Sequence, residues 1–287
     1  MFNIVNKRII FFAISLVVIV AGIVCLCVSG LNTDIDFTGG TAIYVDLGAA
    51  SDETSLRNAI NAVEGVTVAS VQTAEGNSVV IKTSPLTNEL NIVVEDAIKG
   101  VYPNANILST DNVSATVGKE LWGNAAMSIS IAAILMLIYI TIRFELLSGV
   151  SAVLALIHDM LVMIAIYAIF RFPVNSSFIA AILTILGYSI NATIVIFDRI
   201  RENSRFMKQA KFGDIVNTSI WQSMGRSINT SLTTLLTVVM VYILGVPSIK
   251  DFALPLIIGI VAGTYSSIFI AGQFWVLFKG KDAKAGK

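Results

Sequence analysis

Two ionisable side chains, His158 and Asp159, stand next to each other in the middle of a long apolar stretch, residues 148–170. If this stretch crosses a membrane, placing such groups there is costly, which makes them functional candidates. Asp159 could carry a proton, with His158 as a second titrating group. The alternative is a structural pair whose hydrogen bonds hold two helices together. The sequence leaves both interpretations open.

Other polar residues lie at or near apolar stretches. Arg226 precedes one of them and is also explained as an interfacial arginine whose stem lies along apolar surface. Asn191 can only form hydrogen bonds, so we expect it to shape a polar patch between helices. The charges Asp198, Arg199 and Arg201 follow another stretch, where alternating signs are more typical of a solvated face than of a gate.

The sequence offers no pattern of enzyme chemistry, so we expect neither catalytic residues, nor a metal, nor a cofactor. An HExxH zinc motif is absent, and the string GYSIN at 187–191 lacks the closing glycine of a nucleophile elbow. Cys25 and Cys27 are two positions apart on a predicted helix and therefore point to different faces. Neither an enzyme nor a nucleic-acid-binding protein is predicted.

The elements that must position these residues are membrane helices. Of 287 residues, 55% are apolar and 13% are charged, with a mean hydropathy of +0.81, which excludes an ordinary water-soluble domain. A spanning helix needs about 20 mostly apolar residues. Six segments reach or approach that length: 9–28, 124–142, 148–170, 177–197, 228–244 and 252–278.

The distribution of basic residues predicts the orientation. With a cytoplasmic N-terminus, thirteen Lys and Arg residues fall inside and two, Arg171 and Lys250, fall in the short outside loops. This follows the positive-inside rule and places both termini in the cytoplasm. The predicted parts are residues 1–30 with the first helix, an outside domain at 31–121, five helices at 122–278 and a basic tail at 279–287.

The outside domain alternates predicted strands and helices. Strands are expected at 41–47, 66–72, 78–83 and 106–117, from their β-branched content and period-two spacing. One helix is expected after Asp52, a plausible N-cap, and another at 87–99. The order βαββαβ is that of a ferredoxin-like domain with two helices on one face of a four-stranded sheet. Gly39 and Gly40, before the first strand, predict a hinge or entry turn with positive φ.

Several strings occur in an order that resembles one known family. They are DIDFTGGT at 34–41, VGKEL at 117–121, LIHD at 156–159, GYSIN at 187–191, FDRIREN at 197–203, RSINTSLTT at 226–234, DFA at 251–253 and GTYSSIFI at 263–270. Together they resemble the bacterial SecF family, over essentially the whole chain. The resemblance implies a bacterial cytoplasmic-membrane protein related to the resistance-nodulation-division transporters. It also implies pairing with SecD at the Sec translocon channel, and use of the proton-motive force to assist translocation of unfolded polypeptides.

One position departs from the family pattern. The GYSxN string is followed in the family by an aspartate that lies near the arginine matched here by Arg226, whereas this chain has Ala192. Alanine can neither bind nor release a proton. A structural subunit that stabilises SecD without transducing energy therefore remains an alternative. So does a small-molecule or lipid exporter of the resistance-nodulation-division type, although the outside domain is small for one.

Overall fold

The computed structural model describes residues 3–73 and 76–280. Within this part, six helical segments are long and apolar enough to cross a membrane. The prediction of six membrane helices is confirmed. Their bounds are α1 Arg8–Ser29, α5 Ala115–Arg143, α6 Leu146–Phe170, α7 Ser176–Phe206, α8 Phe212–Leu244 and a last segment of α9 Pro247–Ser266, the π-helical Ser267–Ala271 and α10 Gly272–Lys279.

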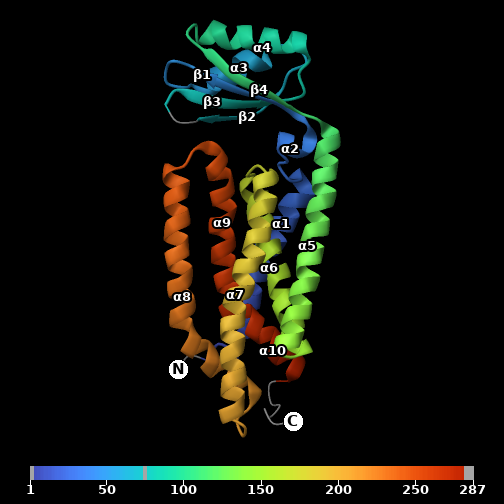
Figure 1. Ribbon diagram of the computed structural model, residues 1–287, viewed down its shortest axis with the longest axis vertical. Helices are drawn as coiled ribbons and strands as arrows, with labels where there is room; N and C mark the ends of the chain where they lie inside the picture. Colours follow the sequence, from blue (N-terminus) through green and yellow to red (C-terminus); the bar gives the residue numbers. More distant parts are fainter. Residues whose placement is uncertain (1–2, 74–75, 281–287) are drawn as a thin grey trace.

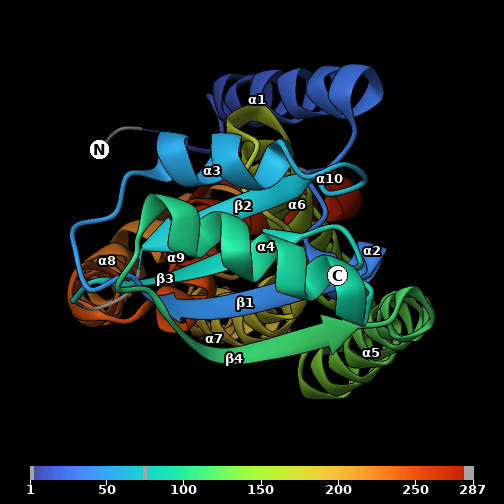
Figure 2. The same ribbon diagram turned by 90° about the horizontal axis from the view of Figure 1, so that it is seen from above.

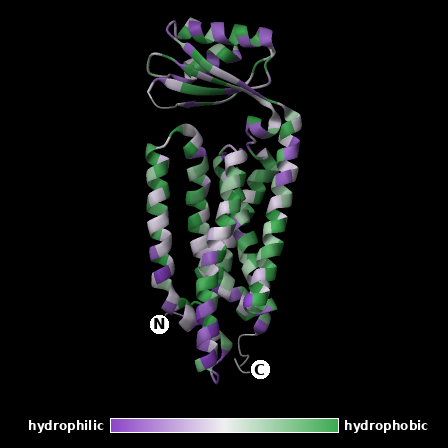
Figure 3. Ribbon diagram, in the orientation of Figure 1, coloured by the Kyte–Doolittle hydropathy of each residue, from purple (hydrophilic) through white to green (hydrophobic). Residues whose placement is uncertain are grey.

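The helices form an elongated bundle that carries a small sheet domain at one end (Figure 1). Apolar residues dominate the middle of the bundle, and hydrophilic residues gather at the end far from the sheet (Figure 3). The last helical segment is the most buried and α6 and α7 follow, whereas α1, α5 and α8 are mostly exposed. The core of the bundle is therefore built around α6, α7 and α9.

The sheet domain has four antiparallel strands in the spatial order β2-β3-β1-β4. The strands are β1 Gly40–Asp46, β2 Val68–Thr73, β3 Ser78–Thr83 and β4 Asn106–Val113, and the helices between them are α3 Glu53–Asn61 and α4 Asn88–Val101. Both helices lie on one face of the sheet (Figure 2). Alternate strand residues such as Ile43, Val45 and Ile81 meet Leu56 and Val94 of the helices in a core of their own.

Local chemistry begins these two helices where the sequence indicates. Asp52 caps α3 by accepting hydrogen bonds from the Thr54 backbone N–H and the Ser55 hydroxyl. The hydrogen bond from Ser55 is the main reason that the pKa of the Asp52 carboxyl is below its usual value. Thr87 caps α4 by accepting from the Leu90 backbone N–H.

Polar contacts hold the sheet domain on the bundle. Lys82 of β3 forms an ion pair with Asp34, which lies just before the short helix α2 Ile35–Thr38 and is buried. At the outer end of α9, Asp251 accepts hydrogen bonds from Gln72 of β2 at 3.5 Å and from Asn175, the cap of α7, at 3.0 Å. The domain thus contacts the helices that form the bundle core.

Several element boundaries differ from the sequence prediction, and one short helix is additional. The last strand ends at Val113 and α5 begins at Ala115, within the segment predicted as strand and assigned to the outside domain. The turn α2 was not predicted. The helices α7 and α8 extend to Phe206 and back to Phe212, well beyond the predicted limits of 197 and 228. A hydropathy window stops at the first charges, but a helix continues through charged residues that face water.

Candidate functional site

Asp159 is the centre of a buried polar cluster in the middle of the bundle. Its side chain is 1% exposed and accepts hydrogen bonds from the hydroxyls of Ser189 on α7, at 2.5 Å, and Ser266 on α9, at 2.8 Å. The His158 Nδ1 lies 3.0 Å from its other oxygen. A carboxylate in an apolar surrounding needs such partners, because an unpaired buried charge is strongly disfavoured. The cluster joins α6, α7 and α9 at one carboxylate.

His158 extends the cluster to α1. Its Nε2 lies 2.8 Å from the Ser15 hydroxyl, and both residues are buried. The imidazole stacks on Tyr265, whose hydroxyl donates to the Phe11 backbone carbonyl at 2.8 Å. Both ring nitrogens of His158 therefore have partners, and the ring can hold a proton on either side.

Close helix packing positions the serines. Gly259 and Gly263 form a small-xxx-small pair on α9, and a side chain at either would meet α7. A Cβ at Gly259 would lie 2.5 Å from Ile185, and one at Gly263 would lie 3.0 Å from the Cβ of Ser189. The absence of side chains lets the two helices approach closely enough for Ser189 and Ser266 to reach one carboxylate.

A π-helical segment follows the cluster directly. Residues Ser267–Ala271 have the wider i to i+5 spacing, and Ser266 lies at the point where the α-helix gives way to it. Short π segments inside α-helices are rare and are often found at functional sites. The segment rotates the rest of the helix relative to α9, so that Trp275 and Lys279 reach Glu145 at the far end of the bundle.

A second polar group lies between α7 and α8. Ala192, Asn191 and Arg226 line a cleft of about 90 Å³ together with Tyr188 and Ser227. Asn191 and Arg226 are exposed, and Ala192 is half-buried. The predicted site residues are therefore in two places: His158 and Asp159 in the buried cluster, and Asn191, Ala192 and Arg226 in this cleft. Ser189 of the buried cluster is one helical turn from Ala192 of the cleft, so this part of α7 contributes to both places.

The charged residues at the far end of α7 form contacts between helices. Asp198 accepts a hydrogen bond from Arg143 at the end of α5, at 3.1 Å. Arg199 donates to Gln222 of α8 at 2.6 Å and to Glu202, and Arg201 donates to the Arg143 carbonyl. These pairs are largely exposed, which fits the predicted solvated face.

The two glycines before the first strand have different roles. Gly39 ends α2 with φ of 78°, the positive value that the sequence predicts. Gly40 does not have a positive φ, and the prediction is wrong for this residue. It begins β1, where a Cβ would lie 2.4 Å from the Thr83 carbonyl oxygen and against Ile35. Glycine is needed there for close packing rather than for a turn.

No group of three or more His, Cys, Asp or Glu side chains that could hold a metal ion occurs among residues 3–73 and 76–280. The groups around Asp159 are hydroxyls and one imidazole, which can donate hydrogen bonds to a carboxylate. The chemistry that this cluster supports is proton binding or hydrogen-bonded cohesion of four helices.

Comparison with known proteins relates this geometry to a family. Residues 93–281 match the family model described as protein export membrane protein SecD/SecF, C-terminal. The chain is 39% identical to the protein translocase subunit SecF of Sebaldella termitidis, over 99% of this chain and 96% of that protein. It is 36% identical to the SecF subunit of Anaerolinea thermophila, over 98% and 96%. The chain belongs to the SecF family.

Longer relatives combine two names in one polypeptide. The chain is 39% identical to the protein translocase subunit SecDF of Bacillus subtilis, over 97% of this chain and 38% of that protein. A crystal structure of SecDF from Thermus thermophilus, titled a translocon-associated membrane protein, matches with a TM-score of 0.85 and 32% identity, over 97% of this chain and 38% of that one. This SecF chain is thus a multi-pass membrane protein and an accessory subunit of protein translocase.

The SecF strings account for the buried cluster. The string at 187–191 supplies Ser189, and the string at 263–270 supplies Gly263, Tyr265 and Ser266. Sequence reasoning identified His158 and Asp159 but missed these serines and Ser15. Serine is common in membrane helices, where its hydroxyl usually bonds to a carbonyl of its own helix. The spacing of Gly259 and Gly263 was the available signal for close packing at this point.

Proposed function

We propose that this SecF chain works with a SecD subunit at the Sec translocon and uses the proton-motive force to assist translocation and release of unfolded polypeptides. The observation that carries the proposal is the buried Asp159, which contacts the side chains of His158, Ser189 and Ser266 and is linked through His158 to Ser15 of α1. His158 and Asp159 form the titrating pair in this chain. Relatives named translocase subunits weigh against the small-molecule exporter alternative.

Protonation of Asp159 would change helix contacts directly. An ionised carboxylate accepts from both Ser189 and Ser266 through one oxygen. A proton on that oxygen would displace one of the two serine donors, and a proton on the other oxygen would change the contact with His158. In the first case one helix, α7 or α9, changes partner. Because α9 also contacts Gln72 of the sheet through Asp251, a shift of α9 is transmitted to the sheet domain.

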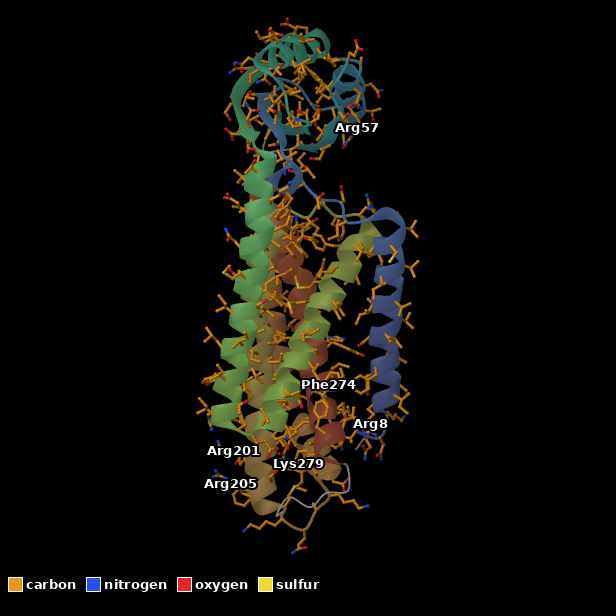
Figure 4. The ribbon with its side chains drawn as sticks, turned by 90° about the vertical axis from the view of Figure 1, so that its right-hand side faces the viewer. Arg8, Arg57, Arg201, Arg205, Phe274 and Lys279 are labelled. Atoms are coloured by element: carbon orange, nitrogen blue, oxygen red, sulfur yellow. The ribbon has the colours of Figure 1, made fainter. Side chains whose placement is uncertain are left out.

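The orientation proposed places the sheet domain outside the cytoplasmic membrane and both termini inside. Arg8, Arg201, Arg205 and Lys279 lie at the end of the bundle far from the sheet (Figure 4). Basic residues at this end suit the cytoplasmic side. We assign the domain to the ferredoxin-like arrangement, supported by the element order and by the strand order β2-β3-β1-β4. Its edge strands, β2 and β4, are the surfaces that could pair with an extended client chain, since α3 and α4 cover one face of the sheet and the other face points toward the bundle (Figure 1).

A structural subunit that stabilises SecD is the second candidate. It is favoured by Ala192, which removes the family's acid, and by the complete set of hydrogen bonds at Asp159. Such a cluster could serve only to hold α1, α6, α7 and α9 together. The two candidates differ in one measurable property, the response of export to a proton gradient.

The test is Asp159→Asn, which keeps the size of the side chain and removes its titration. Export of a slow-folding secretory protein is measured in membrane vesicles that contain this chain and its SecD partner, with and without a proton gradient. We expect the gradient-dependent part of export to fall about tenfold or more, while export without a gradient is unchanged.

The matched control is Asp214→Asn, a change of the same type at an exposed residue in the first turn of α8. It should leave the gradient response as it is. If Asp159→Asn also leaves the response intact but lowers the amount of assembled complex, the structural subunit is the correct function. Quantifying both subunits in the vesicles separates the two outcomes.

A further inference from the structure

The cleft between α7 and α8 is lined by hydrogen-bond donors that lack partners. Among the buried side-chain atoms of the described residues, the hydroxyls of Tyr188 and Ser227 have no hydrogen-bond partner. Both line this cleft, and Ser227 is 5% exposed. A buried hydroxyl without a partner is disfavoured and requires an explanation, such as an ion or water that occupies the site.

A fixed positive charge faces the same space. Arg226 is exposed and lines the cleft, and within residues 3–73 and 76–280 its side chain has neither an ion pair nor a hydrogen bond. No carboxylate lines the cleft, because the residue opposite Arg226 on α7 is Ala192. The site therefore combines one positively charged side chain and two hydroxyl donors without partners, and it has no negatively charged side chain.

Further polar groups line the cleft. Ser231 lies 2.7 Å from the Thr264 hydroxyl of α9, whose single proton is donated to the Ile260 carbonyl at 2.6 Å, so Ser231 donates to Thr264 and not into the cleft. Asn191 carries an amide NH₂ on the opposite wall. The cleft of about 90 Å³ far exceeds the roughly 10–15 Å³ that a single water needs. It has room for an atomic ion with some of its water.

The position of the cleft gives an ion a route from water. Arg226 lies one helical turn beyond Gln222, whose amide oxygen binds Arg199 at the exposed end of α7. That contact is at the basic end of the bundle, which Arg201 and Arg205 mark (Figure 4). An anion is attracted to this end and can reach Arg226 without crossing the apolar middle of the bundle.

We propose that this cleft is a binding site for a small monovalent anion of the chloride class. The anion lies between the Arg226 guanidinium and the hydroxyls of Tyr188 and Ser227. It accepts from both hydroxyls, as a water could, and it also compensates the arginine charge, which a neutral water cannot do. This inference goes beyond the proposed function and does not depend on proton coupling.

The experiment measures thermal unfolding and direct binding with the full chain in detergent. Chloride is replaced by gluconate, an anion too large for the cleft, at constant ionic strength. We expect chloride and bromide to raise Tm in a saturable way, by about 2–4 °C at 100 mM relative to gluconate. Equilibrium dialysis with chloride-36 should find about one ion per chain.

Five variants make the test specific. Arg226→Met and Ser227→Ala should each lose most of the Tm shift and of the chloride-36 binding. Ala192→Asp supplies a tethered carboxylate, so it should no longer respond to chloride and should keep its higher Tm in gluconate. Ala192→Asn fills the same volume without charge and should not gain that stability. Arg205→Met, at an exposed arginine of the same end, should respond to chloride as the wild type does.

Two results would overturn the proposal. One is an equal chloride response in the wild type and in Arg226→Met, which would indicate a general salt effect. The other is loss of chloride-36 binding when the chain is purified with its SecD partner, which would show that a partner carboxylate occupies the cleft instead. A variant that fails to fold is detected by its elution in gel filtration, and dialysis on Ser227→Ala then decides.

Discussion

Positions 159 and 192 are both surrounded by polar groups, but only position 159 carries an acid. Asp159 is buried and accepts hydrogen bonds from α7 and α9. Position 192 faces a cleft with a cation and unpartnered hydroxyls but carries no acid of its own. The polar surroundings of an acid are therefore present at 192, while the acid itself is at 159. This separation makes position 192 suitable for a gain-of-function test.

We predict that Ala192→Asp increases proton-dependent export. The new carboxylate would face Arg226 and could accept from Tyr188 and Ser227, so its charge and partners are already in place. One charge moved across 100 mV corresponds to about 2.3 kcal/mol, enough to bias a conformational change. Export in vesicles is compared for the wild type, Ala192→Asp and Ala192→Asp with Arg226→Met, with and without a gradient. Identical gradient responses in all three would exclude position 192 from coupling.

At the scale of elements, the packing of α9 on α7 decides whether the buried cluster can form. Gly259 and Gly263 face Ile185 and Ser189 so closely that no side chain fits at the first position without movement of α7. Ser266 follows on the same helix and reaches Asp159 only because of this approach. The two glycines act on the site through helix distance and not through contact with Asp159.

Gly259→Leu should separate α7 from α9 and destabilise the bundle. Overpacking of a tight interface typically costs about 1–3 kcal/mol, and here the added carbons meet Ile185 at once. We expect a lower Tm and a weaker gradient response in the export assay. Gly123→Leu is the matched control, because a Cβ at Gly123 of α5 meets nothing within 4 Å. An equal loss of Tm in both variants would contradict the role of α7–α9 packing.

Sequence patterns located most elements for two reasons. Bilayer thickness sets the length of an apolar stretch that can span a membrane, and strands leave a period-two alternation of side chains. The helix caps Asp52 and Thr87 are local features and were readable as well. The ends of α7 and α8 far from the sheet domain were not readable, since their charged residues extend a helix that hydropathy alone would end. The π segment after Ser266 and the convergence of Ser15, Ser189 and Ser266 depend on three-dimensional packing, which no local pattern records.

At the scale of the whole molecule, charge and polarity separate three surfaces. The basic end of the bundle lies opposite the sheet domain, as Figure 4 shows for Arg205 and Arg57. The exposed faces of α1 and α5 are mainly apolar, with residues such as Ile14 and Ile134. On α8, a polar face with Arg226, Asn229 and Thr233 is exposed beside apolar residues such as Leu232 and Leu236. Lipid suits the apolar faces, whereas the polar face of α8 suits a protein partner.

The predicted orientation can be tested with two single cysteines in a background where Cys25 and Cys27 are alanine. Asp96→Cys lies exposed on α4 of the sheet domain, and Lys208→Cys lies exposed between α7 and α8. A membrane-impermeant thiol reagent applied to intact spheroplasts should label the first and not the second. After lysis, both should react. Labelling of Lys208→Cys in intact spheroplasts would reverse the assigned topology.

The last prediction concerns the polar face of α8 and the SecD subunit. Exposed polar side chains cost free energy against lipid, and transmembrane partners gain by packing and hydrogen bonding to them. A bulky residue at Thr233 should therefore weaken association, because small side chains let helices approach closely. We expect Thr233→Trp to reduce co-purification with SecD in mild detergent about tenfold, which corresponds to about 1.4 kcal/mol. Ile134→Trp on the apolar face of α5 is the control and should co-purify as the wild type does. If Ile134→Trp disrupts the complex and Thr233→Trp does not, the partner binds on the side of α5, and the polar face of α8 must serve another purpose.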